Sequence, residues 1–209
     1  MGISRASALA LLISLAATAS AVEPRLERYV AELEDPGRDE WQQPERVVKT
    51  LALRPGMVVA DVGAGTGYFA RRFGAAVAPG GKVLALDVEP GMLDELRRRA
   101  PDAKNVETRV VPPGDPGLAP KSVDVVFICN TGHHLPDRVR YYGNLRQALR
   151  PGGRLVLVDF HKRDLPVGPP VKEKLSRDET LHEAEEAGFR LRAGHDILPY
   201  QYFLELVPK

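Results

Sequence analysis

The sequence predicts an α/β fold built around a mostly parallel β-sheet with helices on both faces. Two patterns lead to this prediction. Short runs rich in β-branched residues alternate with helical stretches between residues 58 and 160, which is typical of parallel βαβ units. Near the end, two extended runs are separated only by Leu198-Pro199, so they can pair only as an antiparallel hairpin, because a parallel pair needs a crossover of about a dozen residues.

The composition favours one globular domain. The 209 residues, 44% of them hydrophobic, are enough for one substantial core and too few for a second full domain. The 29 basic and 28 acidic residues nearly cancel and are interspersed, so no nucleic-acid partner is expected and a small-molecule ligand is favoured. Cys129 is the only cysteine, which excludes an intramolecular disulfide, and its apolar neighbours predict a buried side chain.

The first 21 residues have the pattern of a cleaved export signal. Residues 6–17 are almost wholly apolar, and Ala19-Ser20-Ala21 offers small residues at the spacing that signal peptidase recognises. An apolar core of about 12 residues is shorter than the roughly 20 that span a bilayer, so no stable membrane span is expected. We therefore expect a periplasmic or secreted protein that lacks residues 1–21; the alternatives are an uncleaved anchor and a misassigned start codon, the latter leaving a cytoplasmic chain.

Residues 22–53 are expected to be helical, and the alternating pattern follows them. Helices are predicted at Arg25–Leu33 and Pro44–Leu53, on either side of the turn-rich Glu34-Asp35-Pro36-Gly37. Strands are predicted at Val58–Val62, Lys82–Asp87, Val106–Val111, Val123–Cys129 and Arg154–Phe160, with helices at Phe69–Val77, Gly91–Arg99 and Arg138–Leu149. A helix at Arg177–Ala187, stopped by Gly188, precedes the extended runs Phe189–Ile197 and Tyr200–Val207.

A glycine-rich loop follows the first strand, at the edge where parallel sheets bind ligands. The stretch VVADVGAGTGYFA places Gly63, Gly65 and Gly67 in a GxGxG spacing, where the absence of a Cβ allows a positive φ or a close approach of backbone to ligand. Alone, such a loop is compatible with several cofactors, or with a plain strand-to-helix connection.

Two carboxylates narrow the choice of cofactor. Asp61 precedes the loop and would repel a dinucleotide's pyrophosphate, and Tyr68 stands where the GxGxxG spacing of dinucleotide sites would continue. S-adenosylmethionine carries an ammonium and a sulfonium, which a carboxylate attracts. Asp87 ends the second strand, at the distance along the chain typical of an acid that accepts both ribose hydroxyls. The alternative for Asp87 is a cap of the next helix.

The ordered motifs resemble those of the class I S-adenosylmethionine-dependent methyltransferases, in the small-molecule, type 11 branch that includes quinone-biosynthesis enzymes. The resemblance runs from about Asp39 to the C-terminus. It rests on Asp61-x-Gly63-x-Gly65-x-Gly67, Asp87, Gly114-Asp115-Pro116, Val123-Asp124-Val125-Val126 and Pro151-Gly152-Gly153-Arg154-Leu155. It implies a Rossmann-like, doubly wound, seven-stranded sheet whose last strand is antiparallel, with residues 22–53 as an N-terminal cap or lid and residues 54–209 as the cofactor-binding domain.

The same resemblance implies a set of cofactor-binding residues. Asp61 and the loop residues Gly63, Ala64, Gly65, Thr66 and Gly67 would hold the methionine end. Asp87 with Val88 would lie at the ribose, Asp115 at the adenine amino group, and Asn130 beside the methionine and the transferable methyl. No metal is expected.

The residues near the acceptor are less specific. His133 and His134 lie in a segment predicted to be an extended loop, where adjacent side chains point to opposite sides; this makes a poor metal pair and leaves one of them as a candidate base. The alternative is a structural or cofactor-lining role. Tyr29 and Trp41 either close over the ligand as parts of a lid or serve as packing aromatics.

The sequence thus predicts a methyltransferase that acts on a small molecule by in-line displacement. The chain lacks the Asn/Asp-Pro-Pro-Tyr tetrapeptide of nucleic-acid amino methyltransferases and the several cysteines of arsenite methyltransferases. Two alternatives stay open: an NAD-dependent oxidoreductase, disfavoured by Asp61 and Tyr68, and a module that binds S-adenosylmethionine without turnover. The methylated element and the oligomeric state are not indicated.

Overall fold

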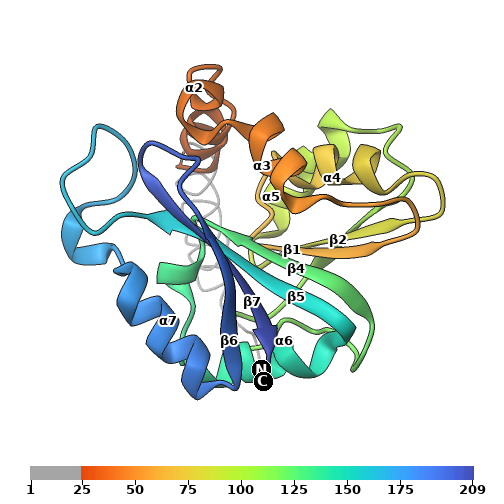
Figure 1. Cartoon of the computed structure of the whole chain (residues 1–209). Helices are drawn as coiled ribbons and strands as arrows, with labels where there is room; N and C mark the ends of the chain where they lie inside the picture. Colours follow the sequence, from red (N-terminus) through yellow and green to blue (C-terminus); the bar gives the residue numbers. More distant parts are fainter. Residues whose placement is uncertain (1–24) are drawn as a thin grey trace, which may run out of the picture.

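The computed structural model describes residues 25–209 (Figure 1). The predicted export signal, residues 1–21, lies outside the described residues. In the described part of the chain, no helix has both the length and the apolar character needed to cross a bilayer.

A single seven-stranded sheet forms the centre of the molecule, with strand order β3-β2-β1-β4-β5-β7-β6. Strands β1 to β5 run parallel to one another, and β7 runs antiparallel to both β5 and β6. The predicted Rossmann-like sheet and its antiparallel C-terminal hairpin are confirmed. The strands are β1 (Val58–Val62), β2 (Lys82–Asp87), β3 (Val106–Val110), β4 (Val123–Cys129), β5 (Leu149–Phe160), β6 (Phe189–His195) and β7 (Gln201–Pro208).

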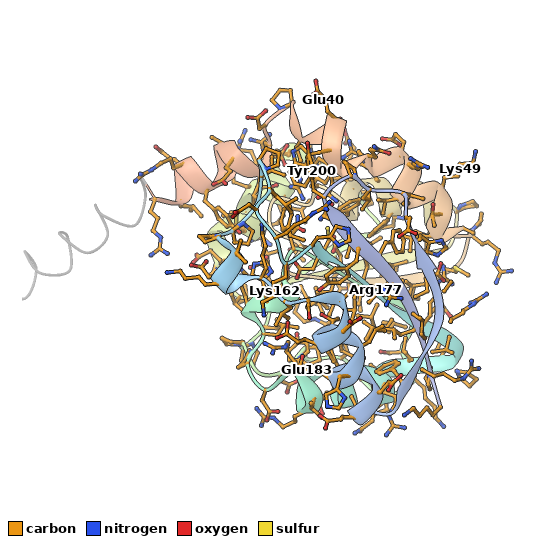
Figure 2. The ribbon with its side chains drawn as sticks, turned by 60° about the vertical axis from the view of Figure 1, so that its left-hand side comes forward. Glu40, Lys49, Lys162, Arg177, Glu183 and Tyr200 are labelled. Carbon is orange, nitrogen blue, oxygen red and sulfur yellow. The ribbon has the colours of Figure 1, made fainter. Side chains whose placement is uncertain are left out.

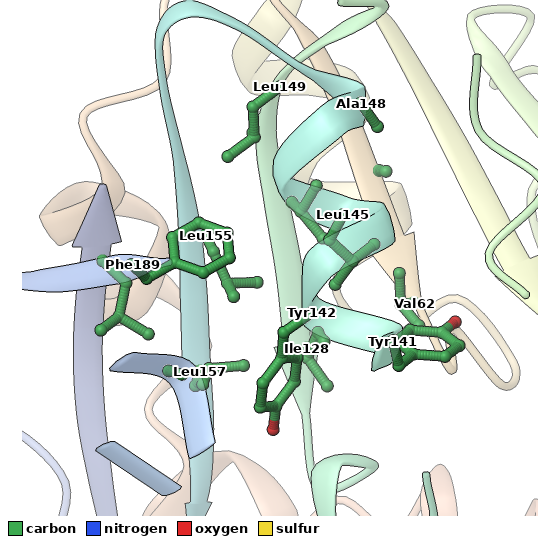
Figure 3. Packing of buried hydrophobic residues seen from close by; sticks show 14 of the residues in the cluster. Val62, Ile128, Tyr141, Tyr142, Leu145, Ala148, Leu149, Leu155, Leu157 and Phe189 are labelled. Carbon is green, nitrogen blue, oxygen red and sulfur yellow. The ribbon is translucent and has the colours of Figure 1, made fainter. Parts of the chain in front are cut away.

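Helices cover both faces of this sheet. Helices α3 (Pro44–Leu51), α4 (Ala70–Val77) and α5 (Pro90–Arg99) pack on one face, and α6 (Arg138–Ala148) and α7 (Arg177–Glu186) pack on the other (Figure 1). Each face of the sheet has its own hydrophobic core: the first lies under α3, α4 and α5, and the second under α6 and α7. Along β4, Phe127 belongs to the first core and Ile128 to the second, because successive strand residues point to opposite faces. Figure 3 shows the second core, where α6 contributes Tyr141, Tyr142 and Leu145.

Helix α7 is fixed at its start and along its length. Ser176 and Glu179 form a reciprocal capping box at its N-terminus. Glu183 accepts two hydrogen bonds of 2.6 Å from Arg138 of α6, and Figure 2 shows Glu183 on the side of α7 turned toward that helix. The ion pair joins the two helices that pack on the same face of the sheet.

Three local predictions differ from the structure. Residues 25–33 and α3 are helical as expected, but a short helix, α2 (Arg38–Gln42), lies between them where only a breaker was expected. Strand β5 begins at Leu149 rather than Arg154. The segment with the two histidines is a 3₁₀ turn, η1 (Gly132–His134), and not an extended loop. A second 3₁₀ turn, η2 (Val171–Glu173), precedes α7.

Candidate functional site

The carboxyl ends of β1, β2 and β4 bring the main predicted residues to one edge of the sheet. Asp61 lies on β1, Asp87 ends β2, and Asn130 directly follows β4. Because β1 pairs in parallel with both neighbours, these ends meet beside the glycine loop.

The glycine loop owes its composition to its backbone and to its protein neighbours. Gly63, Gly65 and Gly67 have φ values of 71°, 53° and 81°, in the left-handed region. A Cβ at Gly63 would collide with the side chain of Thr131, and a Cβ at Gly67 would collide with Leu96. The room that the sequence suggested for a ligand is therefore taken up, at these two positions, by packing.

Asp61 is buried and incompletely paired. Its side chain is 3% exposed, and its Oδ2 has no hydrogen-bond partner among residues 25–209. Burial, and to a smaller extent the charge of Asp87, raise the pKa of Asp61 to about 7, against the opposing effect of Arg38. The ionised form of this carboxylate is therefore stabilised by a cation placed against it.

Asp87 joins the glycine loop to β2. Its Oδ2 accepts a hydrogen bond of 2.7 Å from the backbone N–H of Gly65, and its Oδ1 accepts one of 3.0 Å from that of Glu89. The N-cap of α5 is Glu89, so the alternative reading of Asp87 as the helix cap is wrong. Val88 follows as a 53% exposed side chain, unusual for a large hydrophobic residue in this chain.

Asp115 lies apart from these contacts. It belongs to the exposed loop that follows β3, and its Oδ1 accepts a hydrogen bond of 2.9 Å from the backbone of Gly117. A Cβ at Gly114 would lie 3.6 Å from the guanidinium of Arg140 on α6, so the loop lies beside that helix. Its assignment to the adenine stays a prediction.

Asn130 belongs to a closed ring of amides that the sequence did not indicate. It donates to Gln42 at 3.2 Å, Gln42 donates to Gln201 at 2.8 Å, and Gln201 donates back to Asn130 at 2.5 Å. The ring joins α2, the end of β4 and the start of β7. Its members stand too far apart in the chain for any spacing pattern to reveal them.

The two histidines differ in environment. The His133 ring is 3% exposed, and its Nδ1 lies 3.0 Å from both carboxylate oxygens of Asp159, at the end of β5. The ring centroids of His133 and His134 are 4.1 Å apart, so the two rings do not point to opposite sides as expected, because the turn is 3₁₀ and not extended. Burial and the neighbouring His133 lower the pKa of His134.

Polar groups continue behind the His133–Asp159 pair. A cavity of about 10 Å³ lies between Gly132, Asp159 and Tyr202, among others. The hydroxyl of Tyr142 is buried there without a partner among the described residues, and Tyr202 shares a hydrogen bond of 2.8 Å with Thr180. In the described part of the chain, no group of three or more His, Cys, Asp and Glu side chains is arranged to hold a metal ion.

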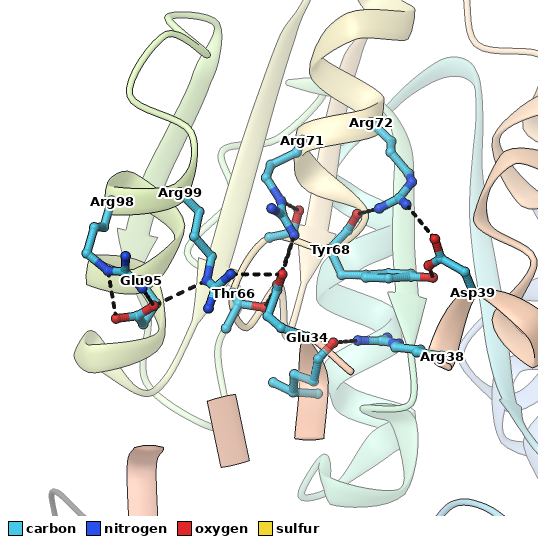
Figure 4. A network of polar contacts seen from close by, with 12 residues as sticks. Glu34, Arg38, Asp39, Thr66, Tyr68, Arg71, Arg72, Glu95, Arg98 and Arg99 are labelled. Carbon is cyan, nitrogen blue, oxygen red and sulfur yellow. Dashed lines mark hydrogen bonds and ion pairs between the residues drawn. The ribbon is translucent and has the colours of Figure 1, made fainter. Parts of the chain in front are cut away.

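The cap closes over the glycine loop through Glu34, which sequence reasoning missed. The Glu34 carboxylate accepts hydrogen bonds from Thr66 at 2.5 Å and from Arg71 at 2.8 Å, and it pairs with Arg99 at 3.2 Å (Figure 4). A Cβ at Gly65 would lie 3.2 Å from the side chain of Leu33. The first described helix thus ends directly on the loop.

The two predicted lid aromatics lie at different places. Tyr29 is half-exposed, and partial burial, then the charge of Asp87, raise its pKa. Trp41 packs on Phe160 at the end of β5, with ring centroids 5.6 Å apart. Trp41 therefore lies on the β5 side, and a lid role of Tyr29 stays a prediction.

Several known proteins are similar to this chain in sequence. A family model described as a methyltransferase domain matches residues 60–155. An arsenite methyltransferase from Halobacterium salinarum is 34% identical over 110 residues, which are 52% of this chain and 28% of that protein. The ubiquinone/menaquinone biosynthesis C-methyltransferase UbiE of Bordetella avium is 26% identical over 158 residues, 70% of this chain and 62% of that one.

A solved structure extends the similarity to the whole fold. The crystal structure of a SAM dependent methyltransferase from Aquifex aeolicus has a TM-score of 0.81 and 29% identity, and it covers 86% of this chain and 96% of its own. The chain spans 28% and 62% of the length of the two curated relatives named above.

Proposed function

Because this chain belongs to the class I S-adenosylmethionine-dependent methyltransferases, we propose that it transfers a methyl group from that donor to a small-molecule acceptor. The observation that carries the proposal is the buried carboxylate of Asp61, whose Oδ2 has no hydrogen-bond partner among residues 25–209, beside a glycine loop held by Asp87.

The residues at the site fit this cofactor. S-adenosylmethionine supplies a methyl group on a positively charged sulfur and also carries an ammonium. A buried carboxylate at the end of β1, with one oxygen lacking a hydrogen-bond partner among the described residues, suits such a cation and would repel the pyrophosphate of a dinucleotide. Asp87 retains acceptor capacity beyond its two backbone hydrogen bonds, which suits the ribose hydroxyls.

Calorimetry with S-adenosylmethionine, S-adenosylhomocysteine and NAD tests the cofactor. We expect both sulfur compounds to bind and NAD to bind more weakly. Asp87→Ala should weaken binding of the sulfur compounds, and Asp87→Asn, which keeps one acceptor for Gly65, should do so by a smaller factor. The control is Asp94→Asn, an exposed carboxylate on α5. Tighter binding of NAD than of the sulfur compounds would favour the oxidoreductase alternative. Undiminished affinity of Asp87→Ala for the sulfur compounds would show that Asp87 does not bind the cofactor.

The chain's own contribution to the reaction would be alignment, exclusion of water and removal of a proton. In this proposal the cap residues and the amide ring would enclose the methionine end and so align the donor away from solvent. At His133, Asp159 accepts at Nδ1, so that nitrogen carries the hydrogen and Nε2 keeps the lone pair that takes a proton. We propose His133 as the base and Asp159 as its positioning residue.

A base of this kind favours particular acceptors. Hydroxyl groups and acidic carbons must lose a proton on methylation, whereas a neutral amine attacks before losing one. We therefore propose O- or C-methylation of an organic molecule. Arsenite is disfavoured, because Cys129 is buried, its pKa is raised by that burial, and it is the only cysteine.

Replacing each histidine separately tests the base. With phenols and carbon acids as acceptors, we expect His133→Asn to lower kcat by about a hundredfold or more while leaving the affinity for S-adenosylmethionine nearly unchanged. His134→Asn is the matched control and should change kcat far less. Equal effects of the two variants on kcat would reduce the His133–Asp159 pair to a structural role. If none of the tested acceptors is methylated, the alternative of a module that binds S-adenosylmethionine without turnover would describe the protein better.

Export is a separate proposal. The apolar N-terminus supports removal of residues 1–21 and a periplasmic or secreted mature protein. Mass determination of the N-terminus from cell fractions tests it: we expect an exported chain that begins at Val22. A cytosolic chain that retains Met1 would contradict it.

A further inference from the structure

The small cavity behind the His133–Asp159 pair has the size and the lining of a water site. It lies on the face of the sheet that α6 and α7 cover, and its volume of about 10 Å³ is the space of one water molecule. Four of the residues around it carry polar side-chain groups, namely Tyr142, Asp159, Thr180 and Tyr202. A cavity this small and this polar suits a water molecule and excludes an organic ligand.

The hydroxyl of Tyr142 needs an acceptor in this cavity. The side chain is fully buried on α6, and its Oη has no hydrogen-bond partner among residues 25–209. Figure 3 shows the hydroxyl turned away from Leu145 and Ala148, the apolar residues that follow on the same helix. Burial raises the pKa of Tyr142, so the hydroxyl keeps its hydrogen and is a donor. A buried donor without an acceptor destabilises a fold, so an acceptor is expected here.

Asp159 lies across the cavity from Tyr142. Its Oδ1 accepts a hydrogen bond of 2.8 Å from the N–H of Phe160, and His133 Nδ1 lies 3.0 Å from both carboxylate oxygens. A Cβ at Gly132 would lie 3.2 Å from Asp159 Oδ2 and 3.8 Å from Tyr142 Oη, so the two groups flank the same small space. They form no direct hydrogen bond, because Tyr142 Oη has no partner in the described part of the chain. A bridging molecule would connect them.

A third partner for such a molecule comes from Tyr202 on β7. Thr180 donates its only hydroxyl hydrogen to the carbonyl of Ser176 at 3.0 Å, so it is the acceptor in its hydrogen bond of 2.8 Å with Tyr202. The Tyr202 oxygen can therefore still accept a hydrogen bond from within the cavity. A water there would accept from Tyr142 and donate to Asp159 and Tyr202, which makes the three hydrogen bonds typical of a buried water.

We propose that one water molecule binds in this cavity and joins the Tyr142 hydroxyl to the Asp159 carboxylate. Tyr142 is then a positioning residue that acts on His133 through the water and Asp159. By donating to the water, its hydroxyl strengthens the hydrogen bond that the water donates to Asp159. Asp159 so held keeps the ring hydrogen of His133 on Nδ1 and the lone pair on Nε2. The catalytic consequence rests on the proposed function, because it takes His133 as the base.

A crystal structure of the unaltered protein at high resolution tests the water directly. We expect density for one water within hydrogen-bond distance of Tyr142 Oη and of a carboxylate oxygen of Asp159. An empty cavity would overturn the inference, whatever the activity of the protein.

Tyr142→Phe tests the link to His133, because it removes the hydroxyl and keeps the ring. In protein isotopically labelled at the histidine nitrogens, we expect the Nδ1 proton of His133 to exchange with solvent about three- to tenfold faster, as for the loss of one hydrogen bond. With phenols as acceptors kcat should fall by a similar factor. The affinity for S-adenosylhomocysteine, measured by calorimetry, should change by less than about twofold, since Tyr142 does not touch the cofactor in this proposal.

Tyr141→Phe is the matched control. Tyr141 is the preceding residue of α6 and is also buried, but it does not line the cavity. We expect this variant to leave the exchange of the His133 proton and kcat nearly unchanged. Backbone amides of β4 serve as an internal reference and should exchange at the same rate in both variants.

The outcomes separate this inference from the proposed function. An unchanged exchange rate in Tyr142→Phe, equal effects of the two tyrosine variants, or an equal acceleration of the β4 amides would overturn the inference. Faster exchange with an unchanged kcat would support the water link and contradict the role of His133 as the base. If no acceptor is methylated, the proposed function fails, while the crystal structure and the exchange rates still decide the inference.

Discussion

At the scale of single residues, Asp61 is the group whose state depends most on the ligand. In the ligand-free protein, burial and the charge of Asp87 raise its pKa to about 7, well above the value of 3.8 that it has when exposed. A raised carboxyl pKa means that folding favours the protonated form. This contribution to stability is complete below about pH 4 and is lost as the pH rises through about 7.

Asp61→Asn should therefore separate stability from binding. Above pH 7 we expect the ligand-free variant to be at least as stable as the unaltered protein in urea unfolding, because it removes a buried charge. The difference should disappear below about pH 4. At neutral pH its affinity for S-adenosylmethionine should fall, measured by calorimetry. A variant that binds normally, or that is destabilised equally at every pH, would contradict the role given to Asp61.

Gly63 illustrates a residue chosen by backbone and packing together. We expect Gly63→Ala to destabilise the fold by about 2 kcal/mol or more, since it combines a left-handed φ with a collision against Thr131. Gly152→Ala is the control, because Gly152 also has a positive φ but a Cβ there would meet open space. Its cost should be about 1 kcal/mol, from strain alone. Chemical denaturation measures both, and equal costs would show that packing against Thr131 is unimportant.

At the scale of elements, the carboxylate of Glu34 joins the end of the first described helix to three parts of the domain. Glu34 touches the glycine loop through Thr66, α4 through Arg71 and α5 through Arg99. Its side chain is 15% exposed, so these contacts are less screened than surface ion pairs. The cap and the two helices beside the loop are therefore coupled at one residue.

Glu34→Gln should loosen the cap without unfolding the sheet. We expect faster release of S-adenosylmethionine in stopped-flow experiments, by several-fold, and faster proteolysis within residues 25–37 in the absence of ligand. Glu40→Gln on α2 is the control, because Glu40 is exposed and points into solvent (Figure 2). Identical release rates in both variants would mean that Glu34 does not hold the cap closed.

Elements with a clear period were predictable from sequence, and short or crowded ones were not. The β-branched runs and the hairpin around Leu198-Pro199 led to the correct sheet. Helix α2 has five residues, too few to show a helical period. The Gly132–His134 turn was predicted wrongly because the local sequence does not show that His133 pairs with Asp159 on another strand.

At the scale of the whole molecule, the cofactor should stabilise the fold by mass action. A ligand present at about 100 times its Kd adds roughly 2.7 kcal/mol to the free energy of unfolding. For a chain of this size we expect Tm to rise by about 5–10 °C with S-adenosylhomocysteine, measured by scanning calorimetry. In Asp87→Ala most of this rise should be absent at the same ligand concentration. A full rise in that variant would remove Asp87 from the binding site.

The site was predictable only where it followed from motifs. Asp61, the loop glycines and Asp87 could be predicted because they lie within 27 residues of one another, at characteristic spacings from two predicted strands. Arg38, Gln201 and Asp159 join the site only through folding, because their partners lie on other elements. Their residue types are ordinary ones for a surface, so burial alone distinguishes them.

The amide ring also bears on the order in which the chain acquires its structure. Gln42 lies near the N-terminus and bonds to Gln201, 159 positions later, at the start of the last strand to be synthesised. Closing so long a loop is entropically costly and slow, so this contact should form late in folding. We therefore expect the amide ring to close only after β7 has entered the sheet between β5 and β6, later than the contacts of Glu34 with Thr66 and Arg71, which span far fewer residues.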